Sequence, residues 1–111
     1  MNTLFAVAIL EGNWRLGCRF RERQPDTSLI YYLNGLNSID KYRTAIQPDN
    51  AKLKFHEKKV LKAIAEVYRE KGDKAKAIFY FTKALYSVAY FPDRQQHNAS
   101  VNREIAELER Q

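Results

Sequence analysis

The sequence predicts an all-α protein with about five helices, arranged as antiparallel hairpins that stack on one another. Apolar residues recur at three- and four-residue intervals along most of the 111 residues, which is the period of an amphipathic helix. Proline, glycine or a capping residue bounds each periodic stretch, and only four glycines and three prolines are present. The strand-prone stretches Tyr31–Tyr32 and Ile78–Phe81 lie inside longer helical patterns. We therefore expect residues 1–111 to form a single helical domain.

The first predicted helix extends from about Thr3 to Arg23. It ends there because the residue before a proline, here Pro25, avoids helical angles. Gly12 and Asn13 lie in its middle and predict a bend or a break. The apolar start, residues 4–10, lacks a preceding basic residue and is far shorter than the ~20 residues that span a bilayer. A buried helix without a membrane span is expected, and a weak membrane-surface anchor is the alternative.

The second predicted helix completes an N-terminal helix pair over residues 1–47. Asp26, Thr27 or Ser28 is expected to cap it, because short polar side chains accept hydrogen bonds from the first free backbone amides of a helix. It extends to about residue 46, before a proline. Its inner face is expected to consist of four aliphatic residues at helical spacing: Leu29, Leu33, Leu36 and Ile39.

Residues 50–91 give the strongest hairpin prediction. Asp49 or Asn50 is expected to cap the third helix, and Gly72 is expected to make the turn that follows it. Asp73 then starts the fourth helix, which ends close to residue 90. The inner face of the third helix is apolar at helical spacing: Leu53, Val60, Leu61, Ile64 and Val67.

The last predicted helix covers residues 98–111 and is expected to cap the hairpin. A polar connector, Asp93–His97, leads to it, and Asn98 or Ser100 is the expected helix cap. The apolar seam of this helix is narrow, and consists of Val101, Ile105 and Leu108.

The hairpin resembles a tetratricopeptide repeat (TPR) over about residues 58–91. The signature positions of that repeat are occupied, in order, by Leu61, Ile64, Ala65, Tyr68, Gly72-Asp73, Ala77, Phe81 and Ala84. The first three are substitutions, and Pro92 comes three residues later than the pattern has it. A generic helical hairpin explains the same residues. The stretch Leu16–Phe20 also fits part of the signature, so a degenerate first repeat competes with an unrelated packing helix.

Positive charge is concentrated in the hairpin. Residues 51–92 carry ten basic and four acidic side chains, whereas residues 1–50 have a net charge of +1 and residues 93–111 of −1. The TPR resemblance implies a partner-binding groove lined by the first helix of each hairpin, with Lys59, Lys62, Glu66 and Arg69 facing it. Helical geometry alone also places these four residues on one face, because they recur at three- and four-residue steps. We expect this face to bind an acidic or extended segment of a protein partner, and a solvated lysine-rich face is the alternative.

Two other functions compete with partner binding. The sequence pI near 9.5 suits nucleic acid, and an arginine cluster near two aromatic residues could contact phosphates and stack on bases: Arg15, Arg19, Arg21 and Arg23, with Trp14 and Phe20. Self-association is the third interpretation, because stacked helical repeats usually need three or more units to bury their faces.

Catalysis and cofactor binding find little support in the sequence. Cys18 is the only cysteine, so it can form neither an intramolecular disulfide nor a cysteine-based metal site, and a reducing, cytoplasmic setting is expected. His56 and His97 lie outside any metal-binding or catalytic motif. We expect a non-enzymatic adaptor, chaperone-like protein or assembly factor without a cofactor or metal.

Overall fold

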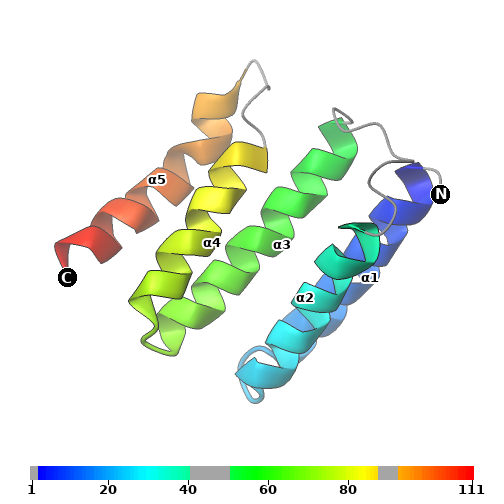
Figure 1. The fold of residues 1–111 in the computed structure, drawn as a ribbon, viewed down its shortest axis with the longest axis horizontal. Coiled ribbons are helices and arrows are strands. Elements are labelled where there is room, and N and C mark those ends of the chain that lie inside the picture. Colours follow the sequence, from blue (N-terminus) through cyan, green and yellow to red (C-terminus); the bar gives the residue numbers. More distant parts are fainter. Residues whose placement is uncertain (1–2, 41–50, 88–92) are drawn as a thin grey trace.

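A computed structural model describes residues 3–40, 51–87 and 93–111, and these form five α-helices. In chain order the helices are α1 (Thr3–Phe20), α2 (Pro25–Asp40), α3 (Ala51–Glu70), α4 (Lys74–Ser87) and α5 (Arg94–Arg110). Figure 1 shows that α1, α3 and α5 run in one direction and that α2 and α4 run in the opposite direction. The fold is therefore all-α and built from packed antiparallel hairpins, as predicted.

The α3–α4 turn confirms the predicted role of Gly72. This glycine has a φ of +83°, in the left-handed region that side chains other than glycine rarely adopt. Its amide donates to the Arg69 carbonyl at 3.0 Å, and the Asp73 amide donates to the Tyr68 carbonyl at 2.9 Å. These two bonds form a Schellman motif, which ends α3. The Asp73 carboxylate then accepts a bond from the Lys76 amide at 3.1 Å and so caps α4.

Two apolar cores lie on either side of α3. The first joins α1, α2 and α3 and includes Leu10, Tyr32 and Ile64, which are fully buried. The second joins α3, α4 and α5 around Phe81 and Val101. The rings of Tyr68 and Tyr80 pack against both cores and stack on each other, with centroids 5.7 Å apart. Because α3 contributes to both cores, it is the structural centre of the molecule.

A close contact between α1 and α2 depends on Gly17. The Tyr32 ring lies so close to this glycine that a Cβ placed there would come within 2.3 Å of the Tyr32 Cε1 atom. The Tyr32 hydroxyl then donates to the Cys18 sulfur at 3.2 Å. Cys18 itself is exposed.

Two helix boundaries differ from prediction near the N-terminus, and an expected break is absent. The α1 helix ends at Phe20, three residues before the predicted Arg23, but it continues unbroken through Gly12 and Asn13. The Asn13 side-chain amide donates to the Ile9 carbonyl at 2.9 Å, a bond that the intact helix accommodates. The α2 helix begins at Pro25, before the predicted caps, because proline suits the first helical position, where no amide donor is needed. The predicted ends near residues 46 and 90, and the predicted cap at residue 49 or 50, fall outside the described residues.

The predicted polar connector Asp93–His97 is wrong. The α5 helix begins at Arg94, directly after Asp93, so Asn98 and Ser100 lie inside the helix and do not cap it. Val101 and Leu108 are buried as predicted. A polar first turn forms helix here because the apolar seam farther along is already anchored on α4, and helix formation propagates at little cost from an anchored segment.

Candidate functional site

The four residues predicted to face a partner lie together on one side of α3, between α1 and α5. This charged side of α3 consists of Lys59, Lys62, Glu66 and Arg69. The structure shows a feature that the sequence did not: each of the four side chains contacts a residue elsewhere in the chain. These contacts decide which of the four remain suited to binding a partner.

Lys59 is held by α1. Its Nζ atom lies 2.7 Å from a carboxylate oxygen of Glu11 and 4.0 Å from the centroid of the Trp14 ring. The hydrogen bond from Lys59 is the main reason that the pKa of Glu11 is lowered. Lys59 thus helps to fix α1 against α3, and replacing it would disturb the packing of these two helices.

Glu66 and Arg69 are part of an ion-pair chain that links α3 to α5 and to the turn after α1. Arg21, just beyond α1, lies 3.8 Å from the Glu66 carboxylate, and Arg69 lies 4.0 Å from it. Arg69 also pairs with Glu104 of α5. The charges at this end of α3 are balanced internally, so they serve the architecture more than a partner.

Lys62 differs from the other three. Its Nζ atom donates to the Ser100 hydroxyl at 3.2 Å, and it makes no ion pair within residues 3–40, 51–87 and 93–111. The neighbouring Lys58 has a lowered pKa, first because it is partly buried and second because the positive charge of Lys62 is close. Two ammonium groups that repel each other create a local preference for an anion.

An exposed aromatic ring lies beside these lysines and was missed by the sequence analysis. Phe55 is 45% exposed, and it borders a hollow of about 160 Å³ together with Lys58, Lys59 and Lys62. We call these four residues and their hollow the Phe55 basin. Their positions follow a three- and four-residue spacing, so they form a single stripe along α3. The sequence did contain a signal for this site, because the helical spacing of Phe55 and the three lysines places one aromatic ring and three cations on the same face of α3.

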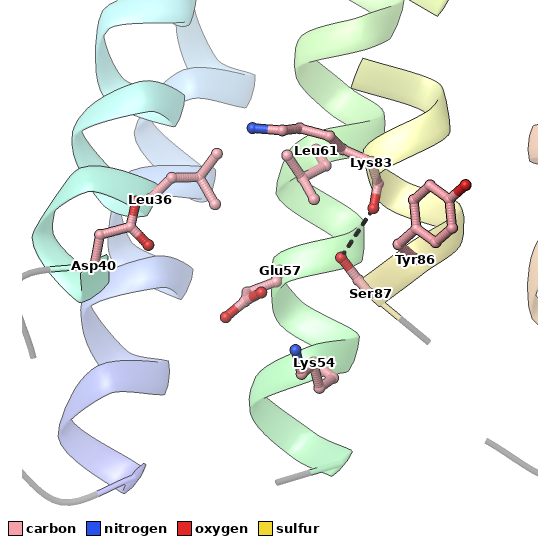
Figure 2. Close-up of a pocket in the computed structure, with 8 residues that line it drawn as sticks. All are labelled: Leu36, Asp40, Lys54, Glu57, Leu61, Lys83, Tyr86 and Ser87. Carbon is pink, nitrogen blue, oxygen red and sulfur yellow. Dashed lines mark hydrogen bonds between the residues drawn. The ribbon is translucent and has the colours of Figure 1, made fainter. Parts of the chain in front are cut away.

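A second hollow lies between α2, α3 and α4 and has a different character. Its volume is about 380 Å³, and Figure 2 shows the eight side chains that line it, namely Leu36, Asp40, Lys54, Glu57, Leu61, Lys83, Tyr86 and Ser87. The lining includes two carboxylates, two lysines and two leucines. The charges balance, so the hollow has no net preference for an anionic or a cationic ligand.

The histidine chemistry of the described residues is limited. The Nδ1 atom of His56 lies 3.0 Å from Glu11, but burial and then the charge of Lys59 lower the pKa of His56, so the ring is neutral near pH 7. In the parts of the chain that the structure describes, no three His, Cys, Asp or Glu side chains are placed to hold a metal ion. The absence of an enzymatic activity stays a prediction.

Comparison of the chain with protein-family models, with curated proteins and with solved structures found no significant match. The resemblance to a TPR therefore rests on the residues named above and stays a prediction. Among the described residues, no helix is both long enough and apolar enough to span a membrane.

Proposed function

We propose that the chain is a non-enzymatic, TPR-like interaction module whose α3 helix binds an acidic segment of a partner protein. The observation that carries the proposal is the crowding of lysines on the first half of α3, beside an exposed ring. Residues 51–62 hold five lysines and one glutamate. Lys58, Lys59 and Lys62 lie together beside Phe55, where Glu11 approaches from α1, whereas Lys54 lines the second hollow with Asp40 and Glu57. An anionic segment would relieve the repulsion between these lysines and would be attracted to them at long range.

The internal contacts move the proposed site toward the N-terminal half of α3. Glu66, Arg69 and Lys59 already form ion pairs with other residues of the chain, Lys59 with Glu11. Lys62, which makes no ion pair within the described residues, is the cation best suited to meet a partner, and Lys58 lines the same hollow beside it. A charge reversal at Lys59 would mainly test the contact between α1 and α3, so it is a poor probe of binding.

Nucleic-acid binding ranks second because the aromatic residues that would stack on bases are already in use. Lys59 covers one face of the Trp14 ring, and Phe20 stacks on Tyr31 with centroids 5.6 Å apart. Arg21 is 2.6 Å from Glu70, so its charge is balanced. Arg19 and Arg23 still border a hollow of about 520 Å³ with Arg21, and this basic cluster keeps the alternative testable.

The test compares two charge-reversed proteins of equal net charge. One carries Lys58→Glu and Lys62→Glu; the control carries Lys76→Glu and Lys83→Glu on α4, where both lysines are exposed. Each is used to capture partners from nuclease-treated extract of the native host, and captured proteins are quantified by mass spectrometry. We expect the first variant to lose its partner about tenfold or more, and the control to retain it.

Two results would reject the proposal. Equal capture by the two variants would show that net charge, and not the α3 site, governs association. Tight binding of single-stranded DNA or RNA, with a log–log salt slope of several units, would favour the nucleic-acid alternative, because each phosphate contact adds nearly one unit to that slope.

A further inference from the structure

The Phe55 basin has the size and lining of a site for one apolar side chain. Its volume of about 160 Å³ is close to that of a protein cavity of about 150 Å³ that holds benzene. The carbon stems of lysines can cover apolar surface while their ammonium groups remain in water. The basin therefore combines an aromatic floor with a rim of cations, contributed by Lys58, Lys59 and Lys62.

We infer that the partner segment inserts one aromatic or aliphatic side chain into the Phe55 basin and places carboxylates on both sides of it, against Lys58 and Lys62. This inference rests on the proposed function and names the chemistry of the partner. Lys58 and Lys62 are one helical turn apart, about 6 Å along α3, and their long side chains can diverge from each other. Alternate side chains of an extended segment face the same way, so carboxylates two residues before and two residues after the apolar anchor lie about 13 Å apart and can meet the ammonium groups of the two diverging lysines.

The charges around the basin favour a peptide over a nucleic acid. A single-stranded nucleic acid needs a groove that stays positive along several phosphates. Here the positive stretch is short, because Glu11 approaches from α1 and Glu66 and Glu104 follow on the same side of the molecule. A short peptide with two carboxylates matches the short run of cations, whereas a long polyanion would meet these glutamates.

The test titrates three heptapeptides into the ¹⁵N-labelled full-length chain and follows backbone amide signals by NMR. The reference peptide is Gly-Glu-Ser-Phe-Ser-Glu-Gly; one control replaces its phenylalanine by alanine, and the other replaces both glutamates by glutamine. We expect the reference peptide to shift signals of residues 52–62, and both controls to bind about tenfold more weakly. A ten-nucleotide oligo-dT is titrated in parallel.

Protein variants show whether Phe55 is the contact. Phe55→Ala is expected to bind the reference peptide about tenfold more weakly and to bind the alanine peptide almost as the unaltered chain does, because the anchor then has no floor to contact. Phe55→Leu should retain binding, since it keeps an apolar floor. The ring is 45% exposed, so these variants are expected to fold, and circular dichroism checks this.

The outcomes separate this inference from the proposed function. If Lys58→Glu with Lys62→Glu abolishes capture of the native partner but Phe55→Ala does not affect peptide or partner, the proposed function stands and the inference is overturned. Equal affinities for the phenylalanine and alanine peptides, or no shifts at millimolar peptide, also overturn the inference. If oligo-dT shifts the basin signals at lower concentration than the peptide, both proposals fail.

Discussion

A glycine-to-alanine change at residue 17 gives a direct test of the α1–α2 contact. An added Cβ would meet three atoms of the Tyr32 ring at 2.3, 2.5 and 2.7 Å, well below ordinary contact distances. Tyr32 is fully buried, so its ring cannot move away without disturbing the core. Overpacking of this kind costs about 1–3 kcal/mol, and the clash here belongs at the upper end of that range. Alanine also favours the helix by about 1 kcal/mol relative to glycine. The free energy of unfolding is therefore expected to fall by about 2 kcal/mol.

Gly12 provides the matched control in the same helix. Nothing lies within 4 Å of a Cβ placed at this residue, so Gly12→Ala gains the helix preference without a clash. It should raise the free energy of unfolding by about 0.5–1 kcal/mol. Urea unfolding followed by circular dichroism measures both variants. If Gly17→Ala is as stable as Gly12→Ala, the close approach of Tyr32 to Gly17 is wrong. If adding Tyr32→Leu to Gly17→Ala restores most of the lost free energy of unfolding, the clash is with the Tyr32 ring.

Three further predictions concern the turn, the second core and the contact between α1 and α3. Gly72→Ala should lower the free energy of unfolding by about 1 kcal/mol, because alanine is strained at a φ of +83°; an unchanged thermal midpoint would contradict this. Phe81→Ala removes a fully buried ring and should cost about 3–5 kcal/mol in chemical denaturation, and a loss below 1 kcal/mol would show that the second core contributes little. Lys59 holds the pKa of Glu11 below its ordinary value of 4.5, so this carboxylate stabilises the fold above that pH, and the contribution is lost as pH falls through the folded-state pKa. Glu11→Gln should therefore be less stable at neutral pH and lose less stability on acidification; parallel pH profiles for the two proteins would argue against the ion pair.

Local sequence signals predicted the α3–α4 hairpin well. Gly72 and Asp73 combine a residue that accepts a left-handed conformation with one that caps a helix, and both roles are fulfilled through hydrogen bonds within a few residues. The signature positions Ala77 and Phe81 likewise lie on the buried face of α4. Such features depend on neighbours in the chain, which is why sequence reasoning reaches them.

Features that depend on distant residues were not predictable in the same way. The partner of Lys59 is 48 residues away in the chain, and the partner of Arg69 is 35 residues away. Helical spacing correctly placed both cations on one side of α3, but it carries no information about which carboxylates approach them. The start of α5 was missed for a related reason, because its polar first turn lacks apolar periodicity and its position is set by packing of residues farther along the helix.

The shared direction of α1, α3 and α5 has a consequence for ligand-dependent stability. Their amino-terminal ends lie at the same edge of the molecule (Figure 1). The first turns of α1 and α3 contain no acidic residue, whereas Asp93 is the N-cap residue of α5. Each such end carries a partial positive charge from aligned peptide dipoles, which nearby lysines on α3 reinforce. A bound carboxylate at this edge would lower the electrostatic energy of the helices themselves, so occupancy by a partner would raise the melting temperature of the whole fold.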